Sequence, residues 1–269
     1  MDDGPAGGPA RQPNPDLELA LQLADLAAEV ALPRFRDRDF TVTIKPDGSP
    51  VTDVDQAVER ALRARLAEVR PRQAVLGEEY GASGDGEWRW YLDPIDGTAR
   101  FVDGDPNWMT FVALGRGADI AVGVVAVPAR SERWWAAKGA GAFRDGERLA
   151  VSTVAQLSDA TVNDDWRGTL ENRIPGRPLT AVAARAHAVR PRDGHGFLAV
   201  AAGQADVALS GGGYAWDYAA PKLIVEEAGG RFSDLAGRAR IDSRNALVTN
   251  GRVHDEVLDV LRAAGTSPS

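Results

Sequence analysis

The chain has 269 residues, of which 44% are hydrophobic and 26% charged, an ordinary balance for a soluble globular protein with a substantial core. With 31 basic and 39 acidic residues the net charge is −8, so no basic surplus exists to grip nucleic acid or an anionic membrane. Because cysteine is absent, disulfides, thiolate nucleophiles and cysteine-based metal sites are excluded. The acidic excess fits either a solvated acidic surface or carboxylates offset by bound cations.

No apolar run approaches the roughly 18 to 20 residues that span a bilayer. Residues 1–14 are acidic, rich in glycine and proline, and lack the apolar core of a signal peptide, so a disordered tail on a cytoplasmic protein is expected. Beyond the tail we expect two subdomains, residues 15–150 with an α+β pattern and residues 151–269 with an α/β pattern.

The first subdomain begins with an amphipathic helix over 16–37, for which Asp16 is the expected N-cap and Pro33 a point of weakening or termination. A strand at 40–45 and a turn lead into a second helix over 52–69, which Thr52 caps. A short buried strand at 74–77, a mobile loop over 81–87 and a strand over 88–97 follow. The alternating pattern of 108–150 then predicts an antiparallel sheet with one face buried.

The second subdomain mixes strands and helices. Strands are expected at 160–164, 205–210, 230–235 and 246–250, and helices at 195–203, 218–230 and 253–264. Gly229 and Gly230 provide the stop signal for the middle helix. The residues therefore indicate a mixed α/β architecture.

Two carboxylates lie three residues apart in the stretch LDPIDGT, where a buried strand is expected to run into a turn. Pro94 biases Asp93 towards extended geometry, and a turn after Asp93 would bring both carboxylates and the Ile95 carbonyl towards one point. Hard oxygen ligands of this kind suit Mg²⁺. A helix starting at Gly97–Thr98 would add free N–H groups that bind an anion. Taken alone, the motif is more typical of a simple turn than of a metal site.

Three further acidic elements lie at expected element boundaries. GEEYG ends a strand, TDVD opens the second helix, and AWDYAA follows three glycines at a helix start. Each has a plainer interpretation, since Asp55 and Asp217 could be helix caps and Glu79 an exposed charge. Four such elements together favour a shared acidic cleft.

These segments resemble the inositol monophosphatase family of Mg²⁺-dependent, lithium-sensitive phosphatases. GEE, LDPIDGTARF and WDYAAPKLIVEEAGG are similar to the family's signature set, KPDGSPVTDVD to its N-terminal segment, and AAKGAGAFRDGERLAVS to its central hairpins. The match runs in order from about residue 16 to 262. Within the family, RWWAAKGAGAF and RPRQAVLGEEYG resemble the actinobacterial histidinol-phosphate phosphatases. The resemblance implies a layered α-β-α-β-α sandwich, as in fructose-1,6-bisphosphatase, and a homodimer.

The resemblance also implies the roles of particular residues. Two to three Mg²⁺ ions are expected, held by Glu78, Asp93, the Ile95 carbonyl, Asp96 and Asp217. Thr98 with Glu78 matches the pair that orients and deprotonates the attacking water, and Asp55 the carboxylate that hydrogen-bonds this threonine. The amides of Gly97 and Thr98 match the phosphate cradle, and Lys45 a cation beside the phosphate.

The segments that should border the leaving group depart from the family pattern. Arg100 stands where the family usually has asparagine, and Asp103 where histidinol-phosphate phosphatases have a basic residue. Residues 163–197 also differ, and within them Asp164, Asp165 and His195 are possible substrate contacts. For His195 the alternative is a helix cap or a solvent-facing side chain.

The sequence therefore predicts a phosphomonoesterase that hydrolyses a small polar metabolite phosphate, with L-histidinol phosphate as the first substrate hypothesis. The alternatives are an inositol or sugar phosphate, a phosphoadenosine phosphate, or a catalytically silent metal-binding relative. No G-x-S-x-G motif is present for a serine nucleophile.

Overall fold

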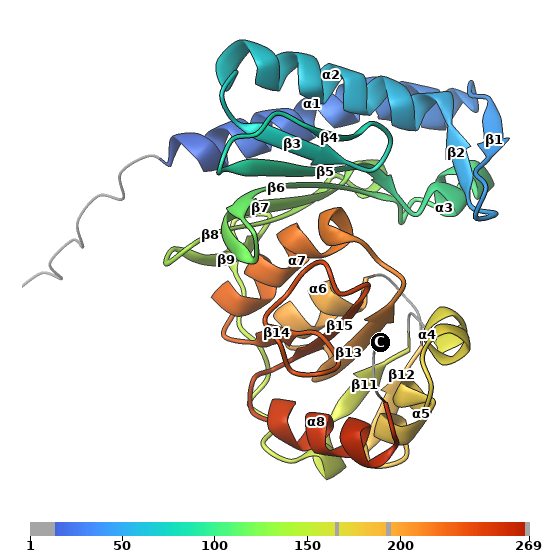
Figure 1. Cartoon of the computed structure of the whole chain (residues 1–269), viewed down its shortest axis with the longest axis vertical. Coiled ribbons are helices and arrows are strands. Elements are labelled where there is room, and N and C mark those ends of the chain that lie inside the picture. Colours follow the sequence, from blue (N-terminus) through green and yellow to red (C-terminus); the bar gives the residue numbers. More distant parts are fainter. Residues whose placement is uncertain (1–13, 165–166, 192–194, 267–269) are drawn as a thin grey trace, which may run out of the picture.

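The computed structural model describes residues 14–164, 167–191 and 195–266 and arranges them in five stacked layers (Figure 1). Two helices cover an eight-stranded sheet, a middle helical layer separates this sheet from a five-stranded sheet, and three helices close the far side. The expected layered α-β-α-β-α sandwich is confirmed. The expected N-terminal tail lies almost entirely outside the described residues.

The outer helical layer consists of α1 (Pro15–Asp37) and α2 (Asp53–Val69), with a hairpin of β1 (Val42–Ile44) and β2 (Pro50–Thr52) between them. The expected cap of α1 was wrong by two positions, because the side chain of Asn14 accepts hydrogen bonds from the N–H groups of Asp16 and Leu17. Nor does α1 end at Pro33, which lies inside the helix four residues before its last residue. Packing of the apolar face against α2 and the sheet outweighs the lost hydrogen bond.

The large sheet has the strand order β10-β9-β8-β7-β6-β5-β3-β4. Its strands are β3 (Ala74–Gly77), β4 (Gly81–Ser83), β5 (Arg89–Asp96), β6 (Met109–Arg116), β7 (Asp119–Val127), β8 (Glu132–Ala137), β9 (Gly141–Arg144) and β10 (Glu147–Arg148), with the 3-10 helix η1 (Pro128–Arg130) before β8. Part of the expected loop over 81–87 is therefore strand β4, which pairs antiparallel with β3. Backbone pairing at the sheet edge overrides the local glycine content.

Both faces of this sheet are buried, so the expectation of one buried face was wrong. Seven of the eight residues of β6 are buried, and neighbouring positions belong to different clusters. Val112 and Leu114 pack in the cluster beneath α1 and α2, whereas Phe111 and Ala113 pack in the cluster that includes α7. A strand covered by helices on both sides has no polar face, which explains the continuous apolar run.

The middle layer contains α6 (Gly196–Ala201) and α7 (Ala215–Glu227), which pack between the two sheets (Figure 1). The helix α7 begins three residues before the expected 218–230 span and ends just before Gly229, as the stop signal predicted. Its residues Tyr218 to Val225 are all buried, because it faces a sheet on each side. This early start places Asp217 in the first turn.

The five-stranded sheet has the order β12-β11-β13-β15-β14. Its strands are β11 (Thr161–Asn163), β12 (Ala188–Arg190), β13 (Val207–Gly211), β14 (Arg231–Ser233) and β15 (Asn245–Thr249), with η2 (Leu157–Asp159) before β11. The last layer comprises α4 (Arg167–Arg173), α5 (Pro178–Ala183) and α8 (His254–Ala263). The sequence analysis did not predict α4, α5 or β12. These elements are seven, six and three residues long, which is too short for a periodic pattern of apolar residues. No helix of the described residues is long and apolar enough to cross a membrane.

Candidate active site

A bulge in β5 places two carboxylates on one face of the large sheet. In the antiparallel register Asp93 lies opposite Phe111 and Asp96 opposite Met109, so three steps along β5 match two along β6. Side chains normally alternate between the two faces of a strand, and the extra residue of the bulge shifts this alternation by one position. Asp93 and Asp96, three residues apart, therefore point to the same face. The expected turn after Asp93 is thus a β-bulge, and it has the geometric effect that the sequence predicted.

The third carboxylate comes from the first turn of α7, which faces the same side of the sheet. Asp217 accepts a hydrogen bond at 2.6 Å from the N–H of Tyr214, which fixes the start of the helix. Asp93, Asp96 and Asp217 each offer an oxygen within 4.8 Å of the others. Residues separated by more than 120 positions therefore meet at one point, which no local pattern could show.

This cluster is electrostatically unfavourable as it stands. Burial raises the pKa of Asp93 well above its ordinary value, and the charges of Glu78, Asp96 and Asp217 raise it further. Burial and the charge of Asp96 likewise raise the pKa of Asp217. The oxygen Oδ1 of Asp93 is buried and has no hydrogen-bond partner among the described residues. Buried carboxylates without donors are costly, so the group is suited to a ligand that supplies positive charge.

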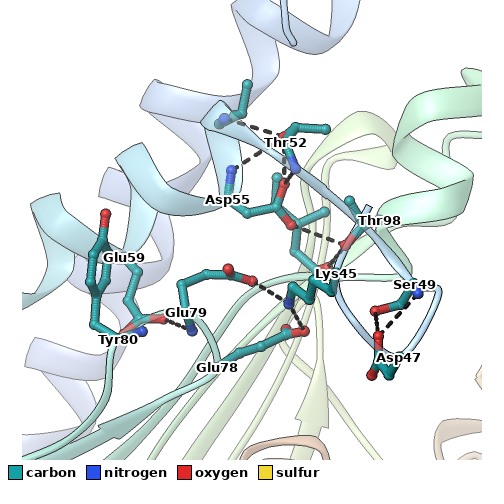
Figure 2. A network of polar contacts seen from close by, with 12 residues as sticks. Lys45, Asp47, Ser49, Thr52, Asp55, Glu59, Glu78, Glu79, Tyr80 and Thr98 are labelled. Atoms are coloured by element: carbon teal, nitrogen blue, oxygen red, sulfur yellow. Dashed lines mark hydrogen bonds and ion pairs between the residues drawn. The ribbon is translucent and has the colours of Figure 1, made fainter. Parts of the chain in front are cut away.

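Thr98 stands beside this cluster and is held by a second buried carboxylate (Figure 2). Its hydroxyl lies 3.0 Å from Asp55 Oδ1 and 3.2 Å from the Ile95 carbonyl, both of which are acceptors. Asp55 also accepts hydrogen bonds from the N–H and hydroxyl of Thr52, forming the capping box of α2. Burial raises the pKa of Asp55, while the bonds from Thr52 and Thr98 oppose that shift. From the sequence, Asp55 was expected either to cap α2 or to hydrogen-bond Thr98. In the structure it does both.

Lys45 lies between two glutamates at the end of β3 (Figure 2). Its Nζ donates to Glu78 and Glu79, each at 2.8 Å. Burial acts to lower the pKa of Lys45, but the two hydrogen bonds outweigh it and raise the pKa. Burial, together with the charge of Glu78, raises the pKa of Glu79 to about 7. The single Lys45 ammonium can neutralise only one of the two adjacent glutamates. The pKa of Lys45 and the pKa of Glu79 are therefore both raised.

The expectation for Glu79 as an exposed charge was wrong, since its side chain is only 5% exposed. Glu78, expected as a metal ligand, lies outside the group of three aspartates and is engaged by Lys45. It would have to exchange this contact for a cation. Its charge nevertheless raises the pKa of Asp93, which places it close to the cluster.

Glu59 is a site-shaping residue that sequence reasoning missed. Its buried carboxylate accepts hydrogen bonds from the N–H groups of Glu79 and Tyr80 (Figure 2). It also pairs with Arg63. A Cβ at Gly77 would lie 2.1 Å from Glu59 Oε1, so any larger residue there would displace the Glu59 carboxylate. An acidic residue on the apolar stripe of α2, four before an arginine, was the available signal.

The short helix α3 (Thr98–Asp103) begins directly after the bulged strand. Gly97 is its N-cap with φ of 80°, a conformation that favours glycine. The first N–H groups of a helix have no partner within it, so Thr98 and the next residues present donors beside the carboxylates.

The residues suggested to border the substrate are placed very differently. The Arg100 guanidinium donates a hydrogen bond at 3.1 Å to the Asn107 carbonyl. Burial, with a smaller contribution from the charge of Arg100, lowers the pKa of His195 to about 3. The imidazole of His195 therefore stays neutral, and its buried Nδ1 has no partner among the described residues. It occupies the N-cap position of α6 without a capping hydrogen bond. Arg100 and His195 thus lie near each other.

Asp103 is exposed at the end of α3, so the structure does not bring it to the cluster. Asp164 follows β11 half-buried, and its N–H donates at 3.1 Å to the Arg190 carbonyl. Asp165 lies outside the described residues.

The aspartate cluster fits a divalent cation. Carboxylate and carbonyl oxygens are the donors that Mg²⁺ prefers, and the orphaned Asp93 oxygen is a ready ligand atom. An acidic group beside a helix N-terminus also provides the two complements that a phosphate ester bound to a metal requires.

Comparison with known proteins agrees with this site. The family model described as "Inositol monophosphatase family" matches residues 12–265, and the chain belongs to this family. It is 44% identical to the histidinol-phosphatase of Mycobacterium tuberculosis, over 92% of this chain and 98% of the relative. It is 41% identical to the histidinol-phosphatase of Streptomyces coelicolor, over 91% and 96%. The solved structure of an IMPase from Thermotoga maritima superposes with a TM-score of 0.79 at 28% identity, covering 94% of this chain and 98% of that one. The chain is accordingly a phosphoric monoester hydrolase, and its family is metal-dependent.

Proposed function

We propose that this phosphatase hydrolyses L-histidinol phosphate to L-histidinol and phosphate, using Mg²⁺ held at the aspartate cluster. The observation that carries the metal assignment is the approach of oxygens of three aspartates to within 4.8 Å of one another, while the buried Oδ1 of Asp93 has no hydrogen-bond partner among the described residues. The substrate rests on the two relatives named histidinol-phosphatase, each of which covers more than nine tenths of this chain.

In this proposal Asp93, Asp96 and Asp217, with Glu78 and the Ile95 carbonyl, hold two to three Mg²⁺ ions. When bound, the ions supply positive charge that offsets the charge developing on the phosphoryl and leaving oxygens and make water a stronger nucleophile.

The chain's own residues orient the attacking water. Thr98 and Glu78 bind it, and Glu78 accepts its proton as the oxygen attacks phosphorus in line with the departing ester oxygen. Asp55 keeps the Thr98 hydroxyl in place through the 3.0 Å hydrogen bond, and Thr52 keeps Asp55 in place. This chain of contacts begins in the cap of α2, so the water position depends on an element far from it in sequence.

The phosphoryl group is held from the other side. The amides of Gly97 and Thr98 donate to its oxygens, and Lys45 supplies a cation once it releases a glutamate. The P–O bond to the leaving group breaks, and the alcohol takes a proton as it departs. Arg100, Asp164 and His195 would then border the leaving group.

The decisive assay measures phosphate release from histidinol phosphate, myo-inositol 1-phosphate, fructose 1,6-bisphosphate and phosphoadenosine phosphate, each with Mg²⁺ and with EDTA. We expect a kcat/KM for histidinol phosphate at least tenfold above the others and loss of release in EDTA. Preference for inositol or sugar phosphate would overturn the substrate and keep the chemistry. Release that persists in EDTA would overturn the metal mechanism, and no release from any substrate would favour a silent relative.

We further propose a cytoplasmic homodimer that lithium inhibits. Sedimentation should give twice the 28.6 kDa chain mass, and a value equal to one chain would contradict the dimer. Millimolar Li⁺ should reduce turnover by competing for a Mg²⁺ position, and an unchanged rate would remove that part of the proposal.

A further inference from the structure

A second cavity lies on the same face of the large sheet as the aspartate cluster. It has a volume of about 320 Å³, within the usual range for sites of small molecules. Its wall combines apolar side chains with an arginine and a rim ion pair, and is formed by Leu76, Arg89, Tyr91, Gly117, Ala118, Ala215, Arg240, Ile241 and Asp242. All of these residues lie within the described part of the chain.

The cavity is a separate site rather than an extension of the reaction centre. Arg89, Tyr91 and Asp93 alternate along β5 and share one face, with Tyr91 between the other two. At about 3.3 Å per residue, the Cα of Arg89 lies roughly 13 Å from that of Asp93. A small phosphate ester held at the aspartates does not reach this arginine.

The wall nevertheless includes residues of three elements that lead into or carry proposed metal ligands. Leu76 lies on β3, two residues before Glu78, which follows that strand; Tyr91 precedes Asp93 by two on β5, and Ala215 precedes Asp217 by two on α7. Leu76 and Tyr91 are also direct neighbours in the sheet. A ligand in the cavity would therefore press on the backbone that positions these side chains.

Arg89 is the group that calls for a ligand. Its Nε is buried and has no hydrogen-bond partner among the residues that the structure describes. The other charges of the wall are matched, because Arg240 donates to both oxygens of Asp242, each at 2.9 Å. Tyr91 is also satisfied, since its hydroxyl donates at 3.2 Å to the Gly117 carbonyl. A buried unpaired guanidinium N–H is rare in native proteins and marks a position for an anion.

We propose that this cavity binds a small organic anion, with its carboxylate or phosphate group on Arg89 and its apolar body against Leu76, Tyr91, Ala215 and Ile241, and that its occupancy changes the affinity of the aspartate cluster for Mg²⁺. This ligand is not the substrate of the proposed reaction, and its binding can be measured without turnover.

Benzoate is a suitable probe for the carboxylate case, and benzamide is its uncharged counterpart of the same shape. Calorimetric or NMR titration of the full chain should give saturable binding of benzoate and at least tenfold weaker binding of benzamide, since hydrogen bonds to a charged group are the strong ones. Phenyl phosphonate, which is not hydrolysed, tests the phosphate-type group. Failure of both anions to bind would overturn the proposal.

Two variants locate the site. Arg89→Met removes the cation without breaking a hydrogen bond of this side chain to any described residue, and should weaken benzoate binding at least tenfold. Ala118→Leu leaves Arg89 in place and fills the cavity from its half-buried rim, and should weaken binding similarly. Arg65→Met changes an exposed arginine of α2 and is the matched control. Equal benzoate binding in all four proteins would overturn the site.

The coupling has its own measurement, made by Mg²⁺ titration in the absence of substrate. Saturating benzoate should shift the apparent Mg²⁺ affinity of the wild-type chain at least twofold and leave that of Arg89→Met unchanged. Identical Mg²⁺ affinities with and without benzoate would overturn the coupling. If the wild-type chain binds benzoate but does not hydrolyse the tested phosphate esters, the proposed reaction is contradicted and the proposed cavity ligand is not.

Discussion

Asp93 and Asp234 are both buried carboxylates, but their surroundings differ completely. Asp234, which follows β14 in the five-stranded sheet, is fully buried and accepts hydrogen bonds from the N–H groups of Ala236 and Arg238, from Arg238 Nε and from the Ser243 hydroxyl. Burial would raise its pKa, yet these bonds outweigh burial and lower it. Asp93 has an unpartnered oxygen and a raised pKa. Burial alone therefore does not identify a site, whereas burial without donors does.

Substitution of Asp96 by asparagine should have the largest effect. If the cluster holds the metal, Asp96→Asn removes a charged ligand and lowers kcat about a thousandfold, since several kcal/mol of charge stabilisation are lost. Thermal melting should show the fold retained. Asp259→Asn, on the exposed face of α8, is the matched control. A folded Asp96→Asn enzyme with near-normal turnover would contradict the assignment of the aspartate cluster as the metal site.

Thr98 tests the positioning network at smaller cost. Thr98→Val removes the hydroxyl but keeps the shape, and should lower kcat about a hundredfold, in the range of proton-transfer and water-orienting groups. Thr98→Ser restores the hydroxyl and should recover most of the activity with little change in KM. If valine and serine behave alike, the hydroxyl does not orient the water.

Asp234 should show the opposite behaviour. Asp234→Asn weakens several hydrogen bonds to a charged acceptor and should cost about 2 kcal/mol of stability, lowering the Tm by roughly 4–8 °C. The kcat of the folded fraction should not change. Reduced kcat at wild-type Tm would mean that the satisfied carboxylate also serves the reaction.

A prediction about the pH dependence of stability alone concerns His254, which is fully buried between Ser233 and Thr249. Burial lowers its pKa from 6.5 to about 4, with the nearby Arg231 charge adding to the shift and Asp255 opposing it. The unfolded chain takes up the proton first, so this contribution is complete above pH 6.5 and is lost as the pH falls towards 4. At about 1.4 kcal/mol per pKa unit, the loss is about 3 kcal/mol.

His254→Gln should therefore flatten the dependence of Tm on pH between 4 and 6.5, whereas His187→Gln, at an exposed position, should not. An unchanged pH dependence in His254→Gln would show that the histidine carries its proton in the folded chain.

Much of the fold and part of the site were predictable because they depend on local signals. Apolar periodicity located α1, α2 and α8, Thr52 was correctly predicted as the cap of α2, and the LDPIDGT motif pointed to Asp93, Asp96 and the start of α3. Two buried faces of the large sheet were not predicted, since one strand cannot reveal what covers its second side. Glu59 and the burial of Glu79 depend on contacts across about 20 residues, which periodicity does not encode.

Direct Mg²⁺ binding tests the central claim, that the aspartate cluster forms a cation site. Calorimetric titration of Mg²⁺ into the metal-free wild type and Asp259→Asn should give the same saturable binding, and Asp93→Asn should lose it or weaken it at least tenfold. Equal Mg²⁺ binding in all three proteins would contradict the account.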